Sequence, residues 1–180
     1  RGMAQVWART GYPRLAYRAT HVAARLETGL RAAVAKARTT LPDGSVFVPV
    51  ALVDGQEQPY DKLTLSKRGS YWNLVMPYVL ASGFFRPASA DATGLLRYLR
   101  NHGSRFLGLV RFSPHTGVTN PGYEGPGSDD VYGTNVARFL ADNDQPDQLL
   151  LSLYGKLAAG MTENTFVSGE GSTIAPVPGR

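Results

Sequence analysis

The sequence predicts an all-α fold built from αα-hairpins, with a minor extended or β segment near residues 45–67. Apolar residues recur at steps of three and four in several segments, which is the spacing of one helix face. The 20 glycines and 12 prolines cluster between these segments. The resulting connections are alternately short and long, as in stacked helical hairpins. A chain of 180 residues is within the range of one domain and can bury a core.

The clearest predicted helix runs from about Pro13 to Ala37, and its arginines lie outside its apolar face. The predicted apolar face consists of Leu15, Ala19, Val22, Leu26, Leu30, Ala33 and Ala37. The β-branched stretch Ser45–Gly55 can form a strand. Pro49 favours an edge strand or an irregular extended segment there.

Two further helices are expected in the middle of the chain. The first covers residues 74–85, with Asn73 or Ser70 as N-cap and Pro77 near its first turn. The second covers roughly residues 91–103, where an aspartate can cap the start and a glycine ends the helix. The apolar stretch after it, "SRFLGLVRF", is ambiguous between helix and strand.

The last third of the chain is expected to contain a long loop and a helical hairpin. Four glycines and three prolines make Ser113–Gly127 a loop, and loops of this length are usually functional or disordered. Ser128 or Asp130 then caps one helix, and Pro146 starts the next. The predicted inward face of that last helix consists of Leu149, Leu150, Leu153, Leu157 and Ala158.

Composition argues against several classes of function. The chain has no cysteine, which excludes disulfides and thiolate metal sites. The net charge of +5 is dispersed rather than clustered with aromatics, so we expect no nucleic-acid partner. The three histidines are isolated and lack HExxH spacing, so we expect no metal and no cofactor. No run reaches about 20 apolar residues, so we expect no membrane partner either.

Four segments between about Tyr60 and Pro176 carry a family resemblance. They are "GSYWNLVMPYVLASGFF", "GLLRYLRNHGSRFLGLVRF", "SDDVYGTNVARFLADNDQPDQLLLSLYGKLAAGMTENTF" and "SGEGSTIAP". These segments resemble six-hairpin glycosidase-type proteins, the (α/α)6 toroids that include glucoamylase and trehalase. The resemblance is closest to a group of large bacterial proteins of this superfamily.

The resemblance implies that residues 1–180 form one partial domain, truncated at both ends, that supplies about half of an (α/α)6 toroid. The remaining part of the parent chain would then be a partner that completes the toroid. Loops at one mouth of such a toroid bind a carbohydrate substrate, and carboxylates there act on a glycosidic bond.

Glycoside hydrolysis needs two carboxyl groups, and we predict Asp130 and Glu170 as this pair. Asp130 follows another aspartate, and adjacent carboxylates raise one pKa, which suits a general acid. Glu170 lies between two glycines, which leave its carboxylate uncrowded. Helix capping is the alternative for Asp130 and an exposed loop position is the alternative for Glu170. Which residue is acid and which is base stays open.

A second group of polar and aromatic residues is predicted to bind the sugar, because aromatic rings stack on its C–H face while polar groups bond its hydroxyls. The group consists of Asp61, Tyr71, Trp72, Asn73, Tyr123 and Tyr132. A tryptophan at a helix start is also common as a packed anchor, so a core position remains open for Trp72.

The expected function is therefore that of a carbohydrate-active protein, most simply a glycoside hydrolase. One alternative is a non-catalytic helical carbohydrate-binding or scaffold domain. Another is a polysaccharide lyase on a similar toroid, in which Tyr123 or His115 acts as base and Arg111 neutralises a uronate.

Overall fold

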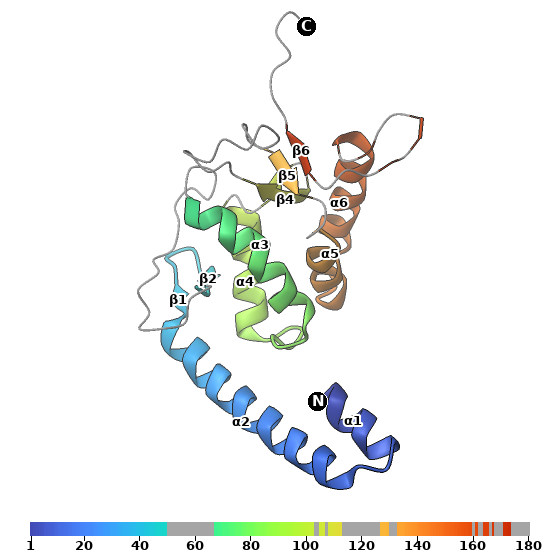
Figure 1. The fold of residues 1–180 in the computed structure, drawn as a ribbon. Coiled ribbons are helices and arrows are strands. Elements are labelled where there is room, and N and C mark those ends of the chain that lie inside the picture. The colour runs from blue at the N-terminus through green and yellow to red at the C-terminus, as the bar shows by residue number, and fades with distance from the viewer. Residues whose placement is uncertain are drawn as a thin grey trace, which may run out of the picture. The chain divides into compact units, whose positions relative to one another are not determined.

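The computed structural model describes residues 1–49, 67–102, 105–106, 108–112, 127–129, 133–159, 161, 164–165, 167 and 171–173. Within these ranges the chain is mostly helical, with six helices and two small antiparallel sheets (Figure 1). The helical character predicted from the sequence is confirmed. The described residues fall into two compact units, Arg1–Arg38 and the part from Thr39 onward.

The first unit is a helical hairpin of α1 (Gly2–Arg9) and α2 (Pro13–Ala37) (Figure 1). Gly11, in the turn between them, has a φ of +84°, a conformation that glycine adopts at no steric cost. Pro13 starts α2. Its lack of an N–H costs nothing there, because the N–H groups of the first turn have no acceptor within the helix. The predicted bounds of this helix are confirmed at both ends. Arg1 and Glu27 form an ion pair between the two helices.

The apolar face of α2 is exposed. Its four large side chains, Leu15, Val22, Leu26 and Leu30, expose 39%, 55%, 67% and 47% of their surface. The helical period of this face is therefore as predicted.

The second unit begins with a two-stranded sheet of β1 (Thr39–Thr40) and β2 (Val46–Phe47). Gly44 lies in the turn between them with a φ of +77°. β2 falls within the predicted extended segment, and the part of that segment from residue 50 to 66 lies outside the described residues.

α3 (Lys67–Ala81) begins earlier and ends earlier than predicted. The expected range of 74–85 is wrong at both ends, and residues 71–73 lie within the helix rather than before it. Pro77 lies inside α3, where it removes one backbone hydrogen bond without ending the helix. The sequence argument placed Pro77 near the first turn, and that assumption shifted the predicted start.

α4 (Ala90–Asn101) packs against β2. The Ser89 hydroxyl accepts a hydrogen bond from the Ala92 N–H at 3.2 Å, so Ser89 and not Asp91 is the N-cap. Gly94 allows the close approach of β2, because a Cβ at this position would lie 2.7 Å from the Cβ of Val46.

A four-stranded antiparallel sheet is the main departure from the predicted all-α class. Its strands are β3 (Arg105–Phe106), β4 (Leu109–Phe112), β5 (Gly127–Asp129) and β6 (Gly171–Thr173), in that spatial order. The ambiguous stretch "SRFLGLVRF" thus forms a β-hairpin. Ser128 is a strand residue opposite Ser172, so its predicted role as helix cap is wrong.

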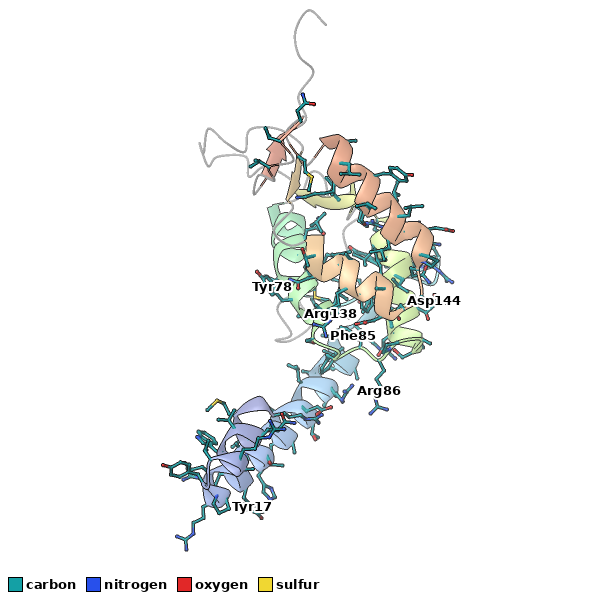
Figure 2. The ribbon with its side chains drawn as sticks, turned by 90° about the vertical axis from the view of Figure 1, so that its right-hand side faces the viewer. Tyr17, Tyr78, Phe85, Arg86, Arg138 and Asp144 are labelled. Carbon is teal, nitrogen blue, oxygen red and sulfur yellow. The ribbon has the colours of Figure 1, made fainter. Side chains whose placement is uncertain are left out.

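α5 (Gly133–Asp142) and α6 (Pro146–Ala159) form the predicted second hairpin. α5 contacts α3 as well as α6, and its buried residues are Val136, Phe139 and Leu140. Asp144 lies in the turn between α5 and α6 (Figure 2) and has a φ of +52°. α6 starts at Pro146 as predicted. Its leucines at 150, 153 and 157 are about half exposed, contrary to their predicted inward position.

Candidate functional site

Trp72 belongs to the core of the second unit and not to a sugar-binding surface. Its side chain is fully buried, 5.0 Å from the ring of Tyr98 and 6.3 Å from that of Phe47, measured between centroids. Its indole N–H donates a hydrogen bond of 2.8 Å to the carbonyl of Val48. The ring has no surface left for a sugar, so the predicted sugar contact is corrected to the core position that the sequence left open.

Asn73 is also corrected, because only 2% of its surface is exposed. Its position within α3 turns it away from solvent, and a ligand arriving from solvent cannot reach its amide. Tyr71 lies in the same helix, and its side chain is outside the described set. Asn73 is therefore not the N-cap that the sequence allowed, because it lies within α3.

The two predicted catalytic carboxylates, Asp130 and Glu170, lie outside the described residues, as do Asp61, Tyr123 and Tyr132. The residues next to the two carboxylates in the chain are described. Asp129 ends β5, Gly171 starts β6, and these two residues are directly paired in the antiparallel ladder.

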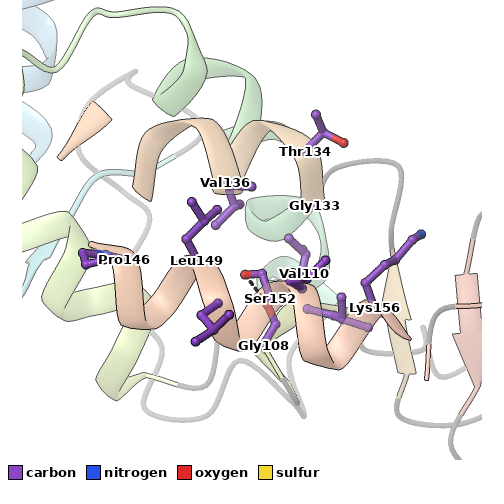
Figure 3. Close-up of a pocket in the computed structure, with 13 residues that line it drawn as sticks. Gly108, Val110, Gly133, Thr134, Val136, Pro146, Leu149, Ser152 and Lys156 are labelled. Carbon is purple, nitrogen blue, oxygen red and sulfur yellow. Dashed lines mark hydrogen bonds between the residues drawn. The ribbon is translucent and has the colours of Figure 1, made fainter. Parts of the chain in front are cut away.

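A cavity of about 520 Å³ lies between β4, α5 and α6 (Figure 3). Apolar groups dominate its lining, which includes Leu109, Val110, Val136, Leu149 and Leu153. Its polar side chains are Thr134, Ser152 and Lys156. The described lining contains no carboxylate and no aromatic ring, so this wall supplies apolar surface and one cation rather than the chemistry of sugar recognition.

The cation of that lining is Lys156, whose pKa is lowered by burial. The lining also includes Gly133 and Thr134 at the start of α5. Gly133 is near the predicted carboxylate in sequence, because it is the third residue after Asp130.

Arg105 holds the β3–β4 turn against α6. Its guanidinium donates to the Gln148 amide oxygen at 2.8 Å, to the Gln148 carbonyl at 3.0 Å and to the Gly108 carbonyl at 2.6 Å. It also donates to the Ser152 hydroxyl. Burial lowers the pKa of Arg105, with a contribution from the charge of Arg100. This cluster fixes one wall of the cavity.

Gly108 explains why the turn can approach α6 so closely. Its φ is +80°, and a Cβ at this position would lie 2.6 Å from the backbone carbonyl carbon of Leu151. Glycine is required here both for conformation and for space. The sequence analysis did not single out this cluster, because its signal, a glycine within a short apolar stretch, fits either a helix or a strand.

A second polar cluster joins the β1–β2 turn to the end of α4. The carboxylate of Asp43 accepts hydrogen bonds from the Asn101 amide at 2.9 Å, the Ser45 N–H at 2.9 Å and the Ser45 hydroxyl at 2.8 Å. His102 Nε2 lies 3.2 Å from the same carboxylate. These donors, Asn101 first, hold the pKa of Asp43 well below its usual range. The sequence analysis missed this cluster because its members lie far apart in the chain.

The described parts of the chain show neither a metal site nor a membrane span. They contain no group of three or more histidine, aspartate or glutamate residues that could hold a metal ion. None of the helices in these parts is long and apolar enough to cross a bilayer.

Comparison with known proteins gives no family for this chain. No family model, no curated protein and no solved structure matches it.

Proposed function

We propose that this chain is part of a carbohydrate-active (α/α)6 toroid in which Asp130 and Glu170 act as the acid/base pair of a glycoside hydrolase. The supporting observation is the direct pairing of their chain neighbours, Asp129 and Gly171. Each proposed carboxylate residue is one peptide unit, about 3.8 Å between α-carbons, from a member of that pair. Asp130 directly follows Asp129, and Glu170 directly precedes Gly171. The two proposed carboxylate residues are far apart in sequence, but each is the chain neighbour of a residue in this pair.

The proposed chemistry follows from the need for two carboxyl groups on either side of a glycosidic bond. One protonates the leaving oxygen, and the other acts as nucleophile or activates a water molecule. Their separation decides the outcome, at roughly 5–5.5 Å for retention and 6.5–9.5 Å for inversion. We propose that Asp61, Tyr71, Tyr123 and Tyr132 contribute to the sugar site.

The remaining part of the parent chain is proposed as the partner of this half-toroid. One observation supports this partner. The large apolar residues of α6, including Leu150, Leu153 and Leu157, are exposed. Helices of a closed toroid bury such faces against neighbouring helices.

The test is glycosidase activity of the parent protein on a panel of oligosaccharides and polysaccharides. Glu170→Gln and Asp130→Asn each remove one carboxylate, and we expect each to lower kcat by roughly 10²–10⁴-fold. Asp144→Asn is the matched control, because Asp144 is an exposed turn residue, and its activity should equal that of the wild type. Unchanged activity in both Glu170→Gln and Asp130→Asn would refute the assignment.

The same panel distinguishes the alternative functions. A non-catalytic binding or scaffold domain would cleave none of the saccharides in the panel. A lyase cleaves uronic-acid polymers by elimination and leaves an unsaturated product that absorbs ultraviolet light. Hydrolysis without that absorbance supports the glycosidase.

A further inference from the structure

The first unit carries a charge very different from that of the rest of the chain. Residues 1–38 contain eight arginines and lysines and a single carboxylate, Glu27, whereas the remaining residues contain eleven cations and thirteen carboxylates. The net charge of +5 for the whole chain therefore conceals a strongly basic helical hairpin joined to a slightly acidic second unit.

Four of these cations form a ridge along one side of α2. Arg14, Arg18, Arg25 and Lys36 are separated by four, seven and eleven residues, so at 3.6 residues per turn they lie within a sector of roughly 40°. All four are exposed. The described carboxylates form no ion pair with any of them, since Glu27 pairs with Arg1 and with Arg31.

The ridge borders the exposed apolar face of α2. By the same helical geometry, Leu15, Val22 and Leu26 lie next to the four cations around the helix. The opposite border of this face is the side that α1 covers, as the half-buried Ala16, Ala23 and Glu27 and the Arg1–Glu27 pair indicate. The apolar face of α2 is thus flanked by α1 on one side and by the four exposed cations of the ridge on the other.

We infer that this surface, the apolar face of α2 with its basic ridge, docks an amphipathic helix whose flanking residues are acidic. Helices pair along apolar residues spaced by three and four, and the charges beside the seam select the partner. Small residues support a close approach, because Ala19 and Ala33 lie on this face and a Cβ on Gly29, at its edge, would meet no atom within 4 Å.

A second copy of this chain does not fit the surface. Self-association would bring two strongly basic hairpins together, and like charges across an interface are unfavourable. The only carboxylate that α2 could offer is Glu27, which Arg1 and Arg31 already hold. The hairpin of a second copy therefore lacks the counter-charge that this surface requires.

An anionic membrane fits less well than an acidic helix. Helices that lie on a membrane carry cations over a broad polar face and insert bulky apolar groups. In α2 the four ridge cations occupy one border only, and small residues interrupt its apolar face. The inference does not depend on the proposed catalytic pair, since it uses no residue of the second unit.

The test measures binding of the full chain to a fluorescein-labelled synthetic helix that carries leucine and alanine along its seam and glutamate beside it. A matched peptide has lysine in place of each glutamate, and vesicles of anionic or neutral lipid are added as competitors. We expect the glutamate peptide to bind roughly tenfold or more tightly than the lysine peptide, and to bind more weakly as the salt concentration rises.

Charge reversal decides the result. The triple variant R14E/R18E/R25E should reverse the preference and bind the lysine peptide, with its helical content verified by circular dichroism. Arg138→Glu, an exposed charge change on α5, should leave the binding unchanged, whereas Leu26→Gln should weaken it. An unaltered preference in the triple variant would overturn the inference. Equal competition by anionic vesicles, lost in the same variant, would also overturn it and assign the surface to a membrane.

Discussion

The helices of the two units have the same apolar periodicity, but their apolar faces are buried in the second unit and exposed in the first. In the second unit the apolar faces of α3 and α4 meet β2, and Trp72, Leu95 and Tyr98 are completely buried. In the first unit the equally regular face of α2 is open, with Leu26 two-thirds exposed. A period of 3.6 residues therefore identifies the face of a helix that needs a partner, but the partner itself has to be found from other evidence.

The largest effect is expected from removing the centre of the buried region. Trp72→Ala leaves a cavity between Phe47 and Tyr98 and an unpaired Val48 carbonyl, so unfolding should become easier by about 3–5 kcal/mol. Urea denaturation measures this change. A loss below about 1 kcal/mol would show that the ring is not an anchor of the core. Trp72→Phe is the companion variant, which keeps an aromatic ring while losing the hydrogen bond to Val48.

A matched pair of leucines tests the comparison directly. Leu95→Ala in α4 removes a fully buried side chain and should cost about 2–5 kcal/mol of unfolding free energy. Leu26→Ala in α2 removes an exposed one and should change this free energy by less than about 0.5 kcal/mol. Equal losses at both sites would mean that the face of α2 is covered in solution.

A matched pair of helical glycines gives effects of opposite sign. Gly94→Ala in α4 forces a methyl group against Val46 and should destabilise the second unit by about 1–3 kcal/mol. Gly29→Ala in α2 meets open space and should stabilise its helix by roughly 0.5–1 kcal/mol, because alanine is the better helix former. Thermal denaturation of both variants, followed by circular dichroism, checks the two signs.

The smallest effect concerns the response to acid. The pKa of Asp43 is lowered in the folded state, so the unfolded chain takes up this proton first as the pH falls. The stabilisation is complete above the unfolded pKa of about 4 and is lost progressively below it. Asp43→Asn should therefore lose less stability than the wild type when urea midpoints are compared between pH 5 and pH 2. Parallel curves for the two proteins would contradict this role.

Local signals predicted the helices better than the sheet. α2 is correct at both ends because Pro13 marks its start and two threonines follow its end, and α6 is correct at Pro146 for the same reason. The start of α3 was missed because its first turns carry polar and aromatic residues and an internal proline. β5 has three residues, and it pairs with a strand more than forty residues away. No local sequence pattern predicts a strand that is so short and has so distant a partner.

The candidate site shows the same division between local and distant information. The burial of Trp72 depends on Phe47 and Tyr98, which lie about 25 residues before and after it, so its neighbours in sequence could not decide it. The Arg105 and Asp43 clusters also join distant segments and were missed. The choice of Asp130 and Glu170 stays a prediction, now supported by the ladder that pairs the residues beside them.

The two tryptophans of the sequence are divided between the units, Trp7 in α1 and Trp72 in α3. Trp7 is half-buried while Trp72 is completely enclosed, so we expect their fluorescence to differ in emission wavelength and in access to a soluble quencher. Replacing either one by phenylalanine leaves a single emitter in one unit. The molecule thus carries an intrinsic optical label on each unit, and the order in which the basic hairpin and the packed core come apart can be followed without attaching a dye.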